Sequence, residues 1–234
     1  GRMTLFSFDL LDRLVKTTYA DGRFVEVEYN EAGNVSVRRD NLGRETHYIY
    51  DLANRLTTLT RPDGTTFNYA YSADGEKISE TDSLGRVTRF EYSPIGLLTR
   101  TTYPDASFET MTYDTESRLV SKTNELGQTT NLEYDQLGRL LATIDPSGVR
   151  WESQFDSVGR KIADKDPLNR VTAYQFNNLD RITKVIRPDN SFVISSFDAV
   201  GNLLSTVDAL GNQWTWVYDN LNRQVSAIQP NGAS

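Results

Sequence analysis

An aromatic residue returns every twenty-one positions along this 234-residue chain, and that period restricts the fold to a tandem repeat. The series contains Phe8, Tyr29, Tyr50, Tyr71, Tyr92, Tyr113, Tyr134, Phe155, Phe176, Phe197 and Tyr218, eleven positions with no shift in register. Because each unit of a repeat array contacts mainly its neighbours, we expect residues 1–234 to form a single continuous array of eleven repeats, taken from a longer array.

A turn is predicted directly after each aromatic, and we call it the first turn. The next residue is always Asp, Asn or Ser, types that hydrogen-bond the backbone two residues on. Three positions later the chain usually has Gly, Asn or Asp, which tolerate a left-handed backbone. Arg follows in seven of the eleven units. The residues that we expect to carry this structural repeat motif are Tyr50, Asp51, Arg55, Gly64, Tyr71, Tyr92, Tyr113, Asp114, Tyr134, Asp135, Gly138, Arg139, Phe155, Asp156, Gly159, Arg160, Tyr218 and Asp219.

A second turn shares the same period, so each unit predicts a β-hairpin. Its marker positions are Gly1, Gly22, Gly43, Gly64, Gly85, Ala106, Gly127, Gly148, Asn169, Asn190, Gly211 and Gly232. In one unit, Leu56–Thr60 predicts a strand, residues 61–64 a turn, and Thr65–Tyr71 a returning strand. The returning strand alternates aromatic Phe67, Tyr69 and Tyr71 with Asn68 and Ala70, a period of two.

These signals predict an all-β fold of about twenty-two short antiparallel strands in one long sheet. Helix is disfavoured because turns interrupt the chain about every ten residues and no helical apolar period survives them. A ribbon about 100 Å long, at roughly 4.8 Å per strand, should curl. Closed into a ring it would be about 34 Å across, too wide for side chains to fill, so a hollow interior or a pairing of exposed faces is expected.

The motif Tyr134-Asp135-Gln136-Leu137-Gly138-Arg139-Leu140, together with the turn Arg61-Pro62-Asp63-Gly64, resembles the RHS or YD-repeat family over essentially the whole chain. Some units depart from its pattern, with Ser72 and Ser93 in place of Asp and Glu76 and Leu97 in place of Arg. The resemblance implies a ribbon of hairpins that spirals into a hollow cocoon. In bacterial toxin complexes, polymorphic toxins and secreted effectors of the family the cocoon holds a toxic C-terminal domain, and teneurins use a similar shell for adhesion at the cell surface.

Bacterial members also cleave themselves near an Asp-Pro-x-Gly-Leu motif, which the segment Asp145-Pro146-Ser147-Gly148-Val149 superficially resembles. Gly148 lies in the ordinary second-turn position and Val149 replaces Leu, so we interpret this segment as a turn. The toxin domain and the cleavage segment are expected to lie outside this piece.

No catalytic, metal or cofactor site is predicted. His47, the only histidine, lies on the polar face of a strand, and no Gly-x-Ser-x-Gly elbow surrounds a serine. The repeated Asp residues fill turn positions and form neither a calcium-binding loop nor a distinct carboxylate pair. The recurrent Arg could touch a cargo, but we expect it to bond the Asp of the neighbouring unit's turn.

The net charge and residue composition limit the classes of partner that this chain can bind. A net charge of −7 argues against nucleic acid, and the chain has no Cys and no apolar run long enough for membrane insertion. Our leading hypothesis is a non-enzymatic shell segment of a secreted or cell-surface bacterial protein, whose partners are the enclosed toxin domain and the neighbouring repeats. The isolated segment could also self-associate through its free edges. The alternative function is an adhesion or glycan-binding module, although Trp is scarce for glycan binding. The alternative architecture is a β-propeller, but its blades would not be built from two nearly equivalent half-units.

Overall fold

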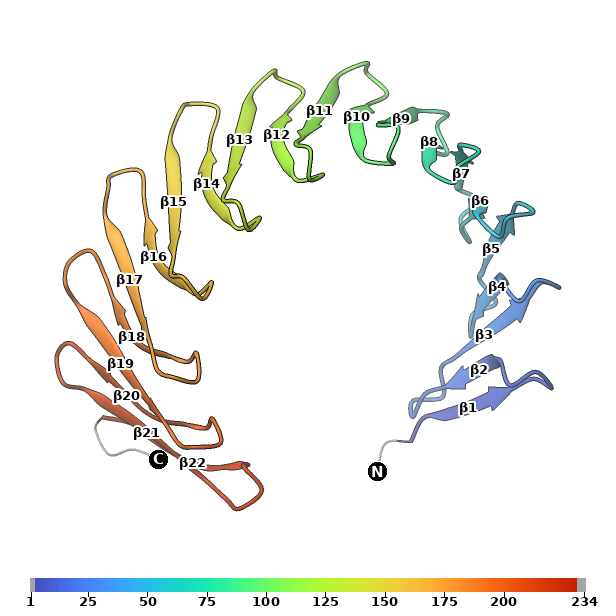
Figure 1. The fold of residues 1–234 in the computed structure, drawn as a ribbon. Coiled ribbons are helices and arrows are strands. Elements are labelled where there is room, and N and C mark those ends of the chain that lie inside the picture. The colour runs from blue at the N-terminus through green and yellow to red at the C-terminus, as the bar shows by residue number, and fades with distance from the viewer. Residues whose placement is uncertain (1–2, 231–234) are drawn as a thin grey trace. The chain divides into compact units, whose positions relative to one another are not determined.

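The computed structural model describes residues 3–230, and the second-turn positions Gly1 and Gly232 lie outside them. The described residues form β-strands and turns only, without a helix (Figure 1). The strands are β1 Leu5–Phe8, β2 Leu14–Thr18, β3 Phe24–Tyr29, β4 Val35–Asp40, β5 Glu45–Tyr50, β6 Leu56–Thr60, β7 Thr66–Tyr71, β8 Lys77–Thr81, β9 Val87–Tyr92, β10 Leu98–Thr102, β11 Phe108–Tyr113, β12 Leu119–Thr123, β13 Thr129–Tyr134, β14 Leu140–Ile144, β15 Arg150–Phe155, β16 Lys161–Lys165, β17 Val171–Phe176, β18 Ile182–Ile186, β19 Phe192–Phe197, β20 Leu203–Asp208, β21 Gln213–Tyr218 and β22 Gln224–Ile228. The predicted all-β architecture of tandem hairpins is confirmed.

The chain divides into two compact units. The first runs to Thr112 and includes Thr123–Gly127, and the second comprises Tyr113–Lys122 and the chain from Gln128 onward. Within the first unit, β1 to β11 pair antiparallel, each with the next strand in sequence. Within the second, β13 to β22 do the same. The order of strands in each unit is therefore the order of the sequence.

Both turn series close in the same way. In the first turn of one unit, Asp51 N–H donates to Arg55 O over 3.0 Å and Asn54 N–H donates to Asp51 O over 3.0 Å. In the second turn, Gly64 N–H donates to Arg61 O over 2.9 Å. Asn54 and Gly64 both have positive φ, 60° and 82°. These are three-residue hairpin loops that end in a left-handed residue, which explains why Gly and Asn dominate both positions.

A β-bulge follows the first turn of every hairpin whose register is described. Tyr50 pairs with Leu56 but Ile49 pairs with Thr58, so Thr57 is an extra residue on β6. After the second turn the register is regular, with Thr60 opposite Thr66 and Leu59 opposite Phe67. Without the extra residue, a repeat of odd length would place successive aromatics on opposite faces of the sheet. The bulge therefore keeps every recurrent aromatic on the same face.

One face of the sheet is half-buried and no second layer covers it within either unit. On β7, Phe67, Tyr69 and Tyr71 are half-buried whereas Asn68 and Ala70 are exposed, as the alternation predicted. Among residues 3–230 only Thr101, Ala142 and Ala163 are less than 9% exposed. Stability must therefore come from the backbone ladder and from contacts between side chains of adjacent strands.

Candidate functional site: the network at the first turns

The Asp of the first turn organises its own loop. One carboxylate oxygen of Asp51 accepts the N–H groups of Ala53 and Arg55 over 2.9 and 3.0 Å. Asp114, Asp135, Asp156 and Asp219 accept the corresponding two N–H groups in their turns. The N–H groups of the loop backbone thus find their acceptor in the first residue of the loop, the role that Asp has in an Asx turn.

The recurrent Arg joins one 21-residue repeat to the next. Arg55 donates from Nε to the second carboxylate oxygen of Asp51 over 2.8 Å, and from Nη1 to the carbonyl oxygen of Ser72 over 2.9 Å. Its guanidinium also lies 4.8 Å from the centre of the Tyr71 ring. The expected side-chain bond to an Asp of the neighbouring turn forms at Arg160, whose Nη1 donates to Asp180 over 2.9 Å, but Arg55 bonds the carboxylate four residues earlier in its own loop. The next turn is contacted through its backbone carbonyl.

Tyr71 completes the link from the other side. Its hydroxyl donates to the carbonyl oxygen of Leu56, the residue after Arg55, over 2.8 Å. Tyr29, Tyr92 and Tyr134 make the equivalent bond to the carbonyl fifteen residues earlier. Where Phe155, Phe176 and Phe197 replace Tyr, the guanidinium of the preceding Arg still lies over the ring, at 4.7 to 5.1 Å. The stacking is therefore the more constant part of the link.

The same network recurs in both compact units of the chain. Arg118, Arg139, Arg160 and Arg181 each donate to the carbonyl seventeen residues later. Gly138 and Gly159 supply the left-handed turn positions beside it, and a Cβ at either would lie 3.7 Å from the Nη1 of the preceding Arg. Tyr50, Tyr113 and Tyr218 end strands β5, β11 and β21 and are half-buried. Sequence analysis missed the Arg-over-ring contact, although the fixed spacing between Arg and aromatic could have indicated it.

Hydrogen bonding keeps the turn carboxylates ionised. The N–H of Arg55, and after it the Arg55 guanidinium and the N–H of Ala53, hold the pKa of Asp51 below its ordinary value. At Asp156 burial would raise the pKa, but the Arg160 side chain and backbone together lower it. Asp135 is lowered in the same way by Arg139. These carboxylates are therefore ionised at neutral pH, the form in which they accept the hydrogen bonds that close the turns.

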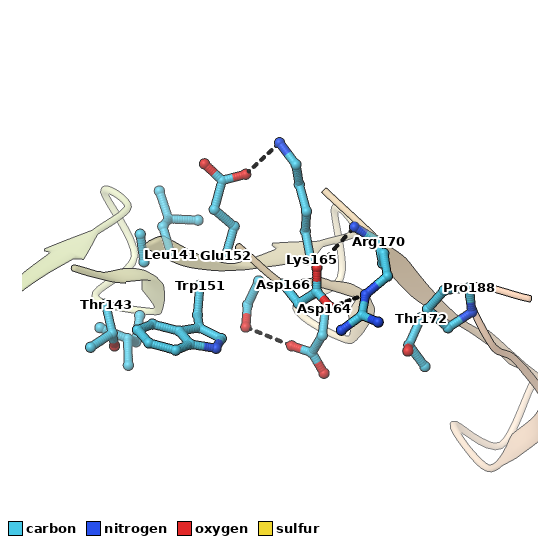
Figure 2. A pocket seen from close by; sticks show the side chains of 13 residues that line it. Leu141, Thr143, Trp151, Glu152, Asp164, Lys165, Asp166, Arg170, Thr172 and Pro188 are labelled. Carbon is cyan, nitrogen blue, oxygen red and sulfur yellow. Dashed lines mark hydrogen bonds and ion pairs between the residues drawn. The ribbon is translucent and has the colours of Figure 1, made fainter. Parts of the chain in front are cut away.

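A shallow groove of about 230 Å³ lies on strands β14 to β17 beside the exposed indole of Trp151 (Figure 2). Its polar groups already bond one another. Asp164 accepts from Ser153 Oγ and Tyr174 Oη over 2.8 and 2.9 Å, and Glu152 pairs with Lys165 at 3.3 Å. Burial works to raise the pKa of Asp164, but the bonds from Ser153 and Tyr174 outweigh it and lower the pKa. The groove is a satisfied part of the sheet surface.

His47 lies at the end of a row of alternating charges on the face of the sheet opposite the recurrent aromatics. Lys16 pairs with Glu26 at 2.8 Å, Arg39 pairs with Glu45 at 2.7 Å, and His47 Nε2 lies 3.0 Å from Glu45. Opposite charges across adjacent strands stabilise a sheet and set its register. His47 thus has a carboxylate neighbour on its own strand and lies opposite Thr60 on the next one.

Asp145 accepts the N–H groups of Ser147 and Val149, both over 2.9 Å, and Gly148 has a φ of 84°, so this segment is an ordinary second turn. Residues 3–230 contain no cluster of three His, Cys, Asp or Glu side chains arranged for a metal ion. In that same range there is no helix of the length and apolar character needed to cross a membrane.

The fold and its turn network define a tandem β-hairpin repeat protein whose unit is an aromatic, a turn Asp and a linking Arg. A family model for the RHS repeat matches residues 29–66, 71–107, 113–150 and 197–234, more than half of the chain. The chain belongs to the RHS repeat family.

Solved structures with a similar fold include two of toxin-complex proteins. One is the crystal structure of TcdB2-TccC3, 15% identical with a TM-score of 0.58 over 97% of this chain. Another is the Photorhabdus luminescens Tc holotoxin pore, also 15% identical with a TM-score of 0.58 over 97% of this chain. This chain spans about 15% to 16% of the length of those chains. A comparison with curated proteins found no match.

Proposed function

We propose that this chain is a non-enzymatic wall segment of a secreted bacterial shell that encloses a toxin domain of the same parent protein. The observation that carries the proposal is the Arg link between successive hairpins, because it uses the recurrent side chains to build a wall instead of a binding pocket. Arg55 joins its own turn, the next turn and the next aromatic at once.

Two further observations support a wall. Among residues 3–230 the half-buried aromatic face carries no second layer of secondary structure, as expected of a sheet that bounds a space. Membership of the RHS repeat family and the fold shared with the Tc toxin structures point to the same role. We further propose that residues 1–234 form one continuous array whose immediate partners are neighbouring repeats of the parent protein.

Protease protection in the longer polypeptide that carries this segment tests enclosure. If the repeats enclose a toxin domain, that domain should survive protease while the shell is intact and be cleaved once the shell opens. Replacing Arg139 and Arg160 together by Ala should open the wall and speed cleavage, whereas the exposed strand substitution Asn131→Ala should not. Equal cleavage of the domain with and without the repeats would contradict the proposal.

Solution scattering of this chain alone tests the wall geometry. A compact globule of this length would have a radius of gyration of about 17 Å. A ribbon open on both faces should give a clearly larger value with a curved, elongated profile. A compact disc would instead favour a closed binding module of the adhesion type.

A further inference from the structure

One repeat in the second compact unit departs from its neighbours on the face of the sheet that carries the recurrent aromatics. Trp151 stands where the repeats on both sides have Thr, Ser153 where they have Leu and Tyr, and Asp164 where they have Thr and Val. Ser153 pairs with Asp164 across β15 and β16, and Trp151 lies two residues before Ser153 on the same face. The three departures therefore meet at one place, and together they line the groove of about 230 Å³ on β14 to β17.

The charged groups of this groove are satisfied by one another, but its aromatic surface and two hydroxyls are open. Trp151 is 45% exposed, and Figure 2 shows its indole on the same side of the strands as the Asp164 carboxylate. Thr143 lies opposite Trp151 and Thr172 lies opposite Asp164, and within residues 3–230 neither hydroxyl has a hydrogen-bond partner. In that range Oδ2 of Asp164 accepts one hydrogen bond, from Tyr174 Oη over 2.9 Å, and a carboxylate oxygen can accept two.

The charges around the groove cancel in pairs. Each charged side chain that lines it is in an ion pair, and the pairs are Glu152 with Lys165 at 3.3 Å, Asp166 with Arg170 at 2.6 Å and Asp164 with Lys161 at 3.1 Å. A phosphate or a free cation would have to displace one of these partners to gain a strong charge interaction. The groove therefore suits a ligand without net charge.

From this we infer that the groove binds one pyranose ring of a neutral saccharide. A pyranose has a face of C–H groups and a rim of hydroxyls. Its C–H face stacks on the Trp151 indole, while rim hydroxyls donate to Asp164 Oδ2 and exchange hydrogen bonds with Thr143 and Thr172. The groove is smaller than the pockets of about 300 Å³ and above that hold drug-sized ligands, which suits a single ring.

A single-ring site differs from the glycan-binding array that the scarcity of Trp disfavours. An array needs an exposed aromatic in every repeat, whereas one ring needs one indole, and Trp151 supplies it. The hydrogen-bonding groups come from the same repeat and the strands beside it. This inference does not depend on the shell proposal, because a wall segment can carry a saccharide site on either face.

NMR titration of the isotope-labelled full chain with the methyl pyranosides of glucose, galactose and mannose tests the site. The indole N–H signal of Trp151 should shift along a saturable curve with at least one of these sugars. Trp214 lies on the same face of β21 and is 36% exposed, so its indole signal is the matched control and should not follow that curve. No saturable shift with any of the three sugars would overturn the inference, and so would equal shifts of the two indole signals.

Variants of the full chain, followed on the signals of the sugar itself, identify the groups that recognise it. Trp151→Ala should abolish binding and Trp214→Ala should leave it unchanged, with the same strand content by circular dichroism. Asp164→Asn should raise the Kd about tenfold, the cost of a lost hydrogen bond to a charged group. Undiminished binding by Trp151→Ala would overturn the inference. Tighter binding of methyl glucuronide, the carboxylated counterpart of the glucoside, would overturn the assignment of a neutral ligand.

Discussion

Arg181 donates its backbone N–H to Asn177 Oδ1 over 3.1 Å, but its Nε is the one buried side-chain nitrogen or oxygen in residues 3–230 that has no hydrogen-bond partner. In the corresponding turns the Nε of Arg55 and of Arg139 donate to the carboxylates of Asp51 and Asp135 over 2.8 and 2.5 Å. The amide oxygen of Asn177 already accepts the N–H groups of Leu179 and Arg181. The second carboxylate oxygen that Nε needs is missing because Asn replaces Asp.

Asn177→Asp should therefore stabilise the protein. A buried donor without a partner costs about 1–3 kcal/mol, and the new bond would join two charged groups. Urea unfolding should show a higher free energy of unfolding for the variant. Asn30→Asp is the matched control, because Asn34 stands there in place of Arg and offers no guanidinium. An equal gain in both variants would show that the Arg181 donor is not the cause.

The hydroxyl of Tyr71 gives a second prediction. Tyr71→Phe removes the bond to the Leu56 carbonyl and should lower the free energy of unfolding by about 0.5–1.5 kcal/mol. Phe155→Tyr should raise it, because its hydroxyl would reach the equivalent carbonyl of Leu140. Opposite changes in urea midpoint are expected from the pair. A loss from Phe155→Tyr would mean that the second carbonyl is not accessible.

The local part of this fold was predictable from the sequence because its signals are local. Asn54 and Gly64 mark turns by their tolerance of positive φ, and the alternation from Phe67 to Tyr71 marks a half-buried strand. The bulge at Thr57 was not predicted, since no residue type requires it. It could have been inferred only from the odd length of the repeat, which otherwise reverses the faces.

The partners of the linking Arg were predictable only in part. The equal spacing of Asp and Arg predicts that the two residues interact. It does not indicate whether the Arg bonds the Asp of its own turn or the Asp of the next turn. The bulge and the loop closure decide this, because they bring the Asp51 carboxylate under Arg55 Nε and leave Nη1 directed at Ser72. The function of the repeat motif residues stays a prediction.

Ala106 offers a test of turn strain. It occupies the second-turn position with a φ of 66°, whereas the other eleven positions of that series are Gly or Asn. A left-handed conformation costs a residue with a Cβ roughly 1–2 kcal/mol, so Ala106→Gly should raise the free energy of unfolding by up to about 1 kcal/mol. Gly64→Ala is the reverse change, and an added Cβ there meets no atom within 4 Å, so backbone strain alone should lower stability. Thermal unfolding of both variants should shift in opposite directions.

Stability should fall in acid because the turn carboxylates are held ionised. The N–H and guanidinium of Arg139 keep the pKa of Asp135 below its ordinary value of 3.8 in the folded protein. As the pH drops, the unfolded chain binds the proton first, so this contribution is complete above about pH 5 and is lost through 3.8 and below. Asp135→Asn lacks the titrating group. The difference in free energy of unfolding between wild-type and Asp135→Asn should be largest near neutral pH and shrink towards pH ~2. Urea unfolding measured across this range checks the sign, and a difference that stays constant with pH would mean that the charge of Asp135 does not stabilise its turn.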